Sequence, residues 1–177
     1  MIREAPRIET DRLILRPWRK DDFRPYHALI QHPDVHRHFG PTPMGMEECW
    51  RRVTSAVGGW QLNGFGTWAV ERKADSKLIG NIGLFTAWRD LEPEFGWDPE
   101  MGWIMAAETH GQGMASEACV AVLDWAGANL RPTPIWAIIA PENEPSLKLA
   151  DKLGFERVSE VDYHDCPTLV LKRPAWG

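Results

Sequence analysis

The order of apolar and polar positions predicts a chain in which strands and helices alternate. Leucines alternate with arginines over residues 12–16, a period of two that indicates a strand with one buried face. Apolar residues three and four positions apart indicate a helix over residues 23–30, which Pro33 ends. The same spacing over residues 46–57 predicts a second helix, which stops at the glycine pair that follows.

Two further strands and a long loop follow the second helix. Residues 67–71 alternate between apolar and polar, and residues 78–85 predict another strand, in which Gly80 and Gly83 indicate a bulge or a close approach of backbones. Residues 86–99 are rich in proline, glycine and acidic residues and carry large aromatic side chains. We predict a loop whose aromatic residues either contact a ligand or pack back onto the domain.

The C-terminal half continues the alternation of strands and helices. Residues 103–105 indicate a short buried strand, and residues 115–130 carry the apolar stripe of a helix. Residues 135–139 are continuously apolar, as in a strand covered on both faces, and a right-handed crossover would lay this strand parallel to the one before it. A further helix and a closing antiparallel pair of strands, at residues 155–160 and 168–172, complete the chain.

Length and composition are those of one globular domain that spans residues 1–177. With 44% hydrophobic and 25% charged residues, the chain can bury a sizeable core. A net charge of −5 argues against nucleic acid as a direct partner and suits a cationic substrate better. No apolar run is long enough to span a membrane, and the first residues, M-I-R-E-A-P-R, lack the apolar core of a signal peptide. The three scattered cysteines form no C-x-x-C pair, and we expect a reduced, cytoplasmic enzyme that is a monomer or a homodimer.

The segment over residues 101–118 carries the most specific chemistry. It reads M-G-W-I-M-A-A-E-T-H-G-Q-G-M-A-S-E-A, so a buried strand leads through a glycine turn into a helix that Ser116 and Glu117 open. That order directs a row of free backbone N–H groups and the positive end of a helix dipole at one point, as a phosphate or pyrophosphate requires. The spacing of Gly111 and Gly113 fits neither a P-loop nor a dinucleotide-binding fingerprint.

The spacing does match the pattern Q/R-x-x-G-x-G/A, with His110, Gly113 and Ala115 at its defined positions. Here the chain resembles the GNAT superfamily of acyl-CoA N-acyltransferases, and G-Q-G-M-A-S-E-A is most similar to its ribosomal-protein N-terminal acetyltransferase (RimJ/RimL-type) branch. His110 departs from the Gln or Arg of the wider superfamily. Two other segments resemble the same family, E-T-D-R-L-I-L-R at residues 9–16 and N-E-P-S-L-K-L-A-D-K-L-G-F at residues 143–155.

This resemblance implies an α+β fold with three layers. We expect a mixed, mostly antiparallel sheet of about six or seven strands flanked by about four helices, with a parallel central strand pair splayed around the cofactor. The resemblance also implies acetyl-CoA as the cosubstrate and a primary amine as the acceptor. No covalent enzyme intermediate is needed, because the amine itself attacks the thioester.

The resemblance assigns the cofactor to the central strand and to the glycine turn. The strand would hold the pantetheine amides through Ile104, Met105 and Ala106, and Asn143 would hold the pantetheine arm. A strand N–H near Trp103 or Ile104 would polarise the thioester carbonyl. The turn would hold the pyrophosphate, and its residues are His110, Gly111, Gln112, Gly113, Met114, Ala115 and Ser116.

Two side chains are candidates for proton transfer. Many enzymes of the resembled family have a tyrosine just after the N-x-x-S-x-x-L stretch, where this chain has Ala150. Ser146, one helical turn earlier, is the candidate donor to the leaving thiolate, and a helix cap is its alternative role. Glu100, at the start of the central strand, is the candidate general base, with an ordinary solvated carboxylate as the alternative. Other candidate bases are Glu94, Asp98 and His164.

An α-amine is the acceptor that the sequence favours. The pKa of an α-amine lies near 7.7 to 8.0, whereas that of a lysine amine is about 10.4. Deprotonating an α-amine therefore costs roughly 3.4 kcal/mol less, so an enzyme with a weak base can use it more readily. Acidic residues among the tryptophans of the 86–99 loop would form an acidic, aromatic groove that suits a peptide N-terminus, namely Glu92, Glu94 and Asp98. A small-molecule amine, such as an antibiotic, a polyamine or an amino acid, is the alternative acceptor. A non-catalytic acyl-CoA-binding module is the alternative function.

Three histidines within residues 32–40 raise the question of a metal site, which we do not expect. Pro33 breaks the helix that would align His32 with His36, and no Cys or carboxylate cluster completes a ligand shell. The resemblance instead implies that this segment is part of the acceptor-side wall, and surface histidines are the plain alternative.

Overall fold

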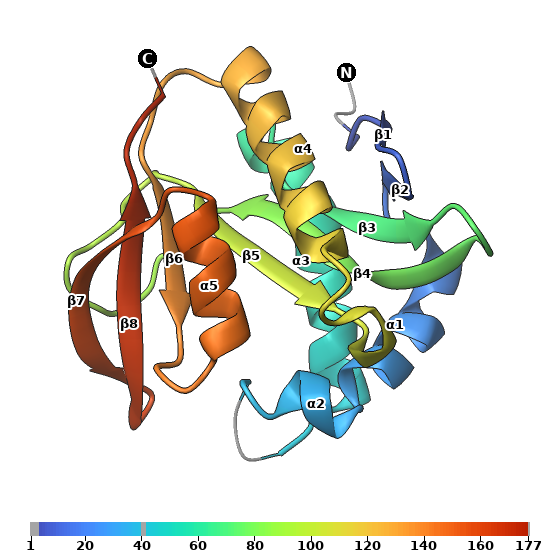
Figure 1. The fold of residues 1–177 in the computed structure, drawn as a ribbon, viewed down its shortest axis with the longest axis horizontal. Coiled ribbons are helices and arrows are strands. Elements are labelled where there is room, and N and C mark those ends of the chain that lie inside the picture. The colour runs from blue at the N-terminus through green and yellow to red at the C-terminus, as the bar shows by residue number, and fades with distance from the viewer. Residues whose placement is uncertain (1–3, 40–41, 177) are drawn as a thin grey trace.

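A single mixed sheet of eight strands runs through the described part of the chain, and helices cover both of its faces (Figure 1). The computed structural model describes residues 4–39 and 42–176, so the first three residues of the N-terminal segment considered above lie outside it. The strand order is β1-β2-β3-β4-β5-β6-β8-β7, and every neighbouring pair is antiparallel except β5 and β6. The predicted α+β fold with a parallel central pair is confirmed.

The elements follow the predicted order. The strands are β1 (Ile8–Glu9), β2 (Leu13–Arg16), β3 (Thr67–Arg72), β4 (Lys77–Phe85), β5 (Glu100–Met105), β6 (Ile135–Ile139), β7 (Glu156–Tyr163) and β8 (Cys166–Arg173). The α-helices are α1 (Phe23–Ile30), α2 (Pro33–His36), α3 (Met46–Asn63), α4 (Met114–Asn129) and α5 (Glu144–Lys152). Within the described ranges, no helix is both long and apolar enough to cross a membrane.

Side-chain alternation along β5 separates two hydrophobic clusters on the two faces of the sheet. Met101 and Met105 pack in the cluster that contains the buried face of α4, which lies in front of the sheet in Figure 1. Ile104 points the other way and packs with the buried residues of α1 and α3. Residues 100, 102 and 104 therefore face α1 and α3, whereas residues 101, 103 and 105 face α4 and α5.

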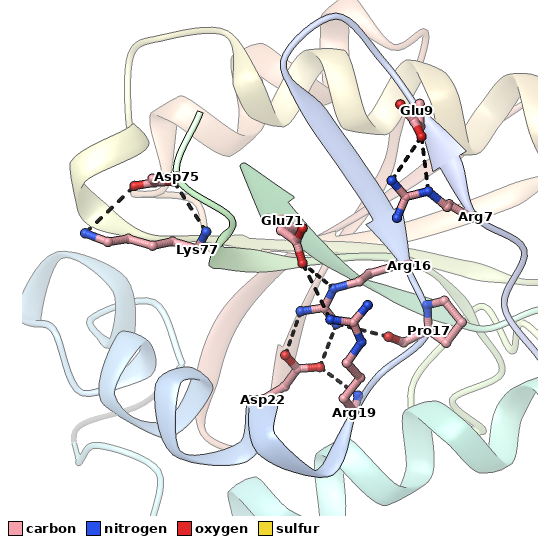
Figure 2. Close-up of polar contacts among 9 residues, drawn as sticks. All are labelled: Arg7, Glu9, Arg16, Pro17, Arg19, Asp22, Glu71, Asp75 and Lys77. Atoms are coloured by element: carbon pink, nitrogen blue, oxygen red, sulfur yellow. Dashed lines mark hydrogen bonds and ion pairs between the residues drawn. The ribbon is translucent and has the colours of Figure 1, made fainter. Parts of the chain in front are cut away.

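Buried ion pairs tie the N-terminal strand to the sheet and to α1. The Arg16 guanidinium donates to both carboxylate oxygens of Asp22 at 2.7 and 2.8 Å and to Glu71 of β3 at 2.7 Å (Figure 2). Arg16 and Asp22 are both buried. The bonds to Asp22 raise the pKa of Arg16 although burial opposes them. Removing either partner would leave a buried charge, so this network fixes the start of α1 against β2 and β3.

The prediction that the second helix stops at Gly58 and Gly59 is wrong, because α3 continues to Asn63. A glycine inside a helix is tolerated at a cost of about 1 kcal/mol relative to alanine. Trp60, which is 4% exposed, extends the buried face of the helix and outweighs that cost. The helix ends where Gly64 adopts the left-handed conformation, with a φ of 76°.

Two short elements, β1 and α2, are added to those predicted from the sequence. Pro33 does follow the end of α1, but it also begins α2, because proline fits the first helical position, where no N–H is needed. The described residues thus form eight strands and five α-helices, slightly more than the expected six or seven strands and four helices.

The glycines of β4 bring its backbone unusually close to its neighbours. The β3–β4 register shifts between Val70 and Glu71, opposite Gly80, which is the predicted bulge. A Cβ atom on Gly80 would collide with the Ile104 carbonyl oxygen of β5. The predicted close approach is therefore also present, and it fixes the position of β5.

The strands β5 and β6 diverge from one point of pairing. Their parallel register joins Glu100 to Trp136, and the Trp136 N–H donates to the Pro99 carbonyl at 2.9 Å. On its other side β6 pairs with β8 over five positions. Beyond Glu100, the edge of β5 that faces β6 has no strand partner among the described residues, which opens space for a ligand.

Candidate active site

A cavity of about 410 Å³ opens along the free edge of β5 and reaches the N-terminus of α4. Its walls are formed by β5, the glycine turn, the first turn of α4 and the start of α5. The predicted site residues that line it are Ile104, Met105, His110, Gly111, Gly113, Ala115, Ser116, Asn143 and Ser146.

The first turn of α4 presents backbone N–H groups for which the described part of the chain provides no acceptor. Gly113 is the N-cap, and no side chain caps the helix. Among the described residues, nothing accepts a hydrogen bond from the N–H groups of Gly111, Gly113 and residues 114–116. The next N–H, that of Glu117, donates to the Gly113 carbonyl at 3.0 Å. This row of donors, at the positive end of a helix dipole, suits the oxygens of a pyrophosphate.

Two glycines give a ligand close access to this backbone. Gly111 and Gly113 have φ values of 72° and 75°, which side chains rarely tolerate. A Cβ atom on Gly111 would meet nothing within 4 Å, and one on Gly113 would meet Arg12 Nη2 at 3.7 Å. Both glycines line the cavity, and neither α carbon has a close contact in the direction of a side chain.

Three predicted cofactor residues do not line the cavity. Ala106 uses its N–H and its carbonyl in hydrogen bonds within the chain, at 2.8 and 2.9 Å. The Gln112 side chain donates to the Glu108 carbonyl at 2.6 Å, and the Met114 side chain is buried in the core. The backbone of the turn can still contact a ligand there, but these side chains do not reach the cavity.

His110 holds the end of β5. Its Nε2 lies 3.1 Å from the Met105 carbonyl oxygen, so the tautomer with a hydrogen on Nε2 donates to the strand. Glutamine and arginine, which the resembled family has at this position, also carry a side-chain N–H donor. His110 thus departs from the family pattern in residue type but still offers a side-chain N–H donor.

A hydrogen-bonded ion pair supports the glycine turn from outside the cavity. Glu117 accepts from the Arg12 side chain at 2.7 Å, from the Arg12 N–H at 2.9 Å and from the Thr10 hydroxyl at 2.6 Å. Arg12 also donates to the Gln112 carbonyl at 2.9 Å. Partial burial acts to raise the pKa of Glu117, but these bonds outweigh it and hold the pKa below its ordinary value. Both residues lie in segments that resemble the family, but their contact, 105 residues apart, could not be inferred from the sequence.

A second cavity, of about 890 Å³, adjoins the first and extends to the hairpin of β7 and β8. It lies against the face of β5 that is turned toward α1 and α3. The residues that line both cavities are Arg37, His38, Phe39, Trp103, Ile104, Asn143 and Ser146. A ligand in the first cavity can thus meet a different ligand in the second.

Glu100 lies in the second cavity, buried and paired. Two nitrogens of Arg89 donate to its two carboxylate oxygens at 2.5 and 2.7 Å, and a third donates to the Tyr163 hydroxyl at 3.2 Å. Burial raises the pKa of Glu100, and the Arg89 cation opposes that effect. A carboxyl group with a raised pKa in a cavity is a candidate for proton transfer. Arg89, in a loop without a regular pattern, was not predicted to be part of the site.

The start of α5 lies where the two cavities meet. Asn143 Oδ1 accepts from the Ser146 N–H at 3.3 Å, so Asn143 is the helix cap and the Ser146 hydroxyl does not have that role. The hydroxyl instead accepts from the Trp103 indole N–H at 3.1 Å. Ala150, where the resembled family often has tyrosine, is fully buried.

The histidine-rich segment contributes to the cavity walls. His32 Nδ1 accepts from the Asp34 N–H at 3.2 Å and caps α2, whereas His38 lines both cavities. Burial, aided by Arg37, lowers the pKa of His38. Within residues 4–39 and 42–176, no group of three His, Cys, Asp or Glu side chains is arranged to hold a metal ion.

The aromatic side chains of the 86–99 loop divide between packing and exposure. Phe95 stacks on Trp136 with ring centroids 4.6 Å apart, which anchors the loop to β6. Trp88 and Trp97 meet edge to face at 5.0 Å, and both are exposed.

The acidic residues of the 86–99 loop do not form a wall of either of these two cavities. Asp98 accepts hydrogen bonds from Thr133 and from the Trp136 indole at 2.8 and 3.3 Å. Neither Asp98 nor Glu92 nor Glu94 lines the two cavities. The loop contributes the cation Arg89 to the second cavity instead.

Comparisons with known proteins agree with this geometry. The family model described as "Acetyltransferase (GNAT) domain" matches residues 12–156. An uncharacterized N-acetyltransferase, YoaA of Bacillus subtilis (strain 168), is 29% identical over 154 residues, which cover 86% of this chain and 84% of that protein.

Solved structures share the fold. A putative GnaT-family acetyltransferase from Bordetella pertussis is 29% identical, with a TM-score of 0.84 and coverage of 96% of this chain and 99% of that one. A spermidine N-acetyltransferase from Vibrio cholerae, in complex with CoA and spermine, is 19% identical with a TM-score of 0.71 and coverage of 93% and 96%. Since the family model covers most of the chain, the protein belongs to the GNAT acetyltransferase family.

Proposed function

We propose that this protein transfers the acetyl group of acetyl-CoA to a primary amine by direct attack within a ternary complex. The observation that carries the proposal is the meeting of two cavities at Trp103 and Ser146. One of them ends at the unpaired N–H groups of α4, and the other contains Glu100. A module that only binds acyl-CoA would have no need of the second cavity.

The first cavity is the proposed cofactor site. Residues 110–116 would hold the pyrophosphate, mainly through backbone N–H groups. Along a strand, the backbone N–H groups point alternately to one neighbouring strand and to the other. The Ala106 N–H donates to the Ile79 carbonyl on the β4 side, so the N–H of Ile104, two residues earlier, also points toward β4. The backbone groups of β5 directed toward β6 are then those of Trp103 and Met105, and the Met105 carbonyl already lies 3.1 Å from His110 Nε2. This favours Trp103 over Ile104 as the N–H that stabilises the oxyanion, and the Asn143 amide would hold the pantetheine arm.

The proposed chemistry needs two proton transfers. The neutral amine attacks the thioester carbonyl, the new C–N bond forms, and Glu100, directly or through water, takes the proton that nitrogen loses. The C–S bond then breaks, the Ser146 hydroxyl donates a hydrogen bond to the leaving thiolate, and the thiolate takes up a proton from water. The contact with Trp103 supports this role, because it uses a lone pair of the hydroxyl and leaves its hydrogen available.

An α-amine is the proposed acceptor, since its lower pKa demands less of the base. The segments that resemble ribosomal-protein N-terminal acetyltransferases favour a peptide N-terminus. A putative ribosomal-protein-serine acetyltransferase from Vibrio cholerae is 20% identical and, like the spermidine N-acetyltransferase, supports the fold alone. A small-molecule amine is therefore the second candidate, and the size of the second cavity admits one.

Release of free thiol from acetyl-CoA tests the function. The acceptors are short peptides with free and blocked N-termini, amino acids, polyamines and aminoglycosides, and native mass spectrometry of the purified protein looks for bound CoA. We expect turnover with amines that have a free α-amino group. Bound CoA without thiol release in the presence of any amine would identify a binding module instead.

A further inference from the structure

One wall of the second cavity carries hydrogen-bond donors that lack an acidic partner. Arg52 of α3 and Asn81 of β4 both line this cavity. Its other arginines, Arg37 and Arg89, form ion pairs at 3.2 and 2.5 Å. For Arg52, in contrast, no carboxylate of the described residues lies within 4.0 Å of the guanidinium.

Arg52 is directed toward the cavity by its neighbours. Its guanidinium carbon lies 5.8 Å from the centroid of the Phe39 ring, and Phe39 lines the same cavity. Burial raises the pKa of the Tyr26 hydroxyl and of Glu100, and the nearby Arg52 cation opposes part of each rise. A planar guanidinium held in this way can bind a carboxylate through two parallel hydrogen bonds.

Asn81 adds a second, buried donor. The residue is 8% exposed, and its Oδ1 accepts from the Tyr26 hydroxyl at 2.8 Å. Burial raises the pKa of Tyr26 to about 12, so the phenol stays neutral and keeps its hydrogen. No described residue accepts a hydrogen bond from Asn81 Nδ2, which leaves the N–H groups of this amide for the cavity.

The two donors lie beside the strand at which the proposed reaction occurs. Asn81 is the register partner of Ile104 on β5, and Ile104 lines both cavities. Glu100 is on the same face of β5. An acceptor that presents its amine to the free edge of β5 would thus have its neighbouring substituent at Arg52 and Asn81.

We propose that Arg52 and Asn81 form a subsite for a carboxylate group on the amine acceptor. The acceptor is then an amine with a carboxylate a few bonds away, either a free amino acid or a peptide with an acidic residue at its N-terminus. The acidic side chains of the cavity, Glu100 and Glu142, lie outside ion-pair distance of Arg52 and leave its charge for the ligand. This inference rests on the proposed transferase function, and it replaces the cationic acceptor that the net charge suggested.

Matched acceptors and matched variants test the subsite. Thiol release is measured with L-alanine, L-leucine, L-aspartate and L-glutamate, with their α-carboxamides, and with peptides that begin with Asp or with Asn. The variants are Arg52→Gln and, as a control on the same helix, Arg51→Gln, whose exposed side chain does not line the cavity. Binding of the same amino acids to the CoA-saturated protein is followed separately by ligand-observed NMR.

We expect the wild-type protein to prefer the acceptor with the carboxylate over its carboxamide partner. This preference should be seen in one of the two sets of acceptors, the free amino acids or the peptides that begin with an acidic residue. In Arg52→Gln the ratio of kcat/KM for carboxylate to carboxamide should fall by about tenfold to a hundredfold, as loss of a charged hydrogen bond predicts. Arg51→Gln should keep the wild-type ratio. No preference for carboxylates, or an equal loss on both members of a pair, would overturn the subsite.

Failure of the transferase function has a different signature. Amino-acid binding that depends on Arg52, without thiol release from any acceptor, would overturn the transferase and uphold the subsite. Thiol release from amines without carboxylates, unaffected by Arg52→Gln, would uphold the transferase and overturn the subsite. Neither binding nor turnover would overturn both.

Discussion

The indole N–H of Trp103 donates to the Ser146 hydroxyl at 3.1 Å and so joins β5 to α5 across the divergent strand pair. Both residues line both cavities. Because the indole can only donate, the hydroxyl oxygen accepts, and its own hydrogen is directed elsewhere. In the proposed mechanism, this contact holds the Ser146 hydroxyl that donates to the leaving thiolate.

Replacing Ser146 by alanine tests that role. We expect kcat to fall by about a hundredfold, the lower range for loss of a general acid, with little change in the Kd of CoA. Trp103→Phe removes the indole donor but leaves the serine hydrogen, so its loss in kcat should be much smaller. A Ser146→Ala enzyme with the wild-type kcat would exclude the serine from the mechanism.

Glu100 should control the pH dependence on the acidic side. A general base must be ionised, so kcat/KM should rise with pH through the pKa of Glu100, which burial raises above its ordinary value of 4.5. Glu100→Gln should lower kcat/KM and abolish this rise in a pH–rate profile. It also leaves the half-buried Arg89 without its anion, which costs up to about 3 kcal/mol. The double variant Arg89→Gln with Glu100→Gln removes that charge, and a pH profile like the wild type in this variant would dismiss Glu100 as the base.

The ion pair of Glu117 with Arg12 should stabilise both the fold and the cofactor site. The pKa of Glu117 is lower in the folded protein than its ordinary value of 4.5, so its contribution is present above about pH 4.5 and is lost as the pH falls through the folded-state pKa. Glu117→Gln should lower the free energy of unfolding by about 1 kcal/mol at pH 7 and less at pH 3. It should also weaken CoA binding in calorimetry, because Arg12 loses its anchor beside the glycine turn. Glu144→Gln, in the exposed first turn of α5, is the control, and equal effects of both variants on CoA binding would contradict a specific role.

Ala115 offers a test of the cofactor site without backbone strain. It lies in the first turn of α4 and lines the first cavity. Ala115→Glu places a side chain and a negative charge where the pyrophosphate is proposed to bind, and we expect CoA binding to be lost while thermal unfolding stays close to wild type. Ala128→Glu, exposed on the same helix, should bind CoA normally. If Ala115→Glu binds CoA as tightly as the wild type, the cofactor site lies elsewhere.

Local signals were sufficient for much of the fold. The strand, glycine turn and helix at residues 101–118 could be predicted because each depends on its own residues: Gly111 and Gly113 on positive φ values, and α4 on its apolar stripe. Residues 135–139 form the predicted strand, since continuous apolar character needs a sheet covered on both faces. The end of α3 was missed because a glycine pair weakens a helix without ending it, and the packing of Trp60 decided the outcome.

The walls of the site were decided by the tertiary structure alone. Nothing near Arg52 in the sequence indicates that its side chain faces the same cavity as Asn81, or that Arg89 neutralises Glu100, because these contacts join separate elements. The acidic residues of the 86–99 loop also could not be placed from the sequence. Their composition suggested a groove wall, but in the structure Asp98 accepts a hydrogen bond from Thr133. The sequence by itself determined the order of elements and the backbone of the glycine turn, which follow from local conformation. Only the packing of strands and helices from distant parts of the chain decided which charges line the two cavities.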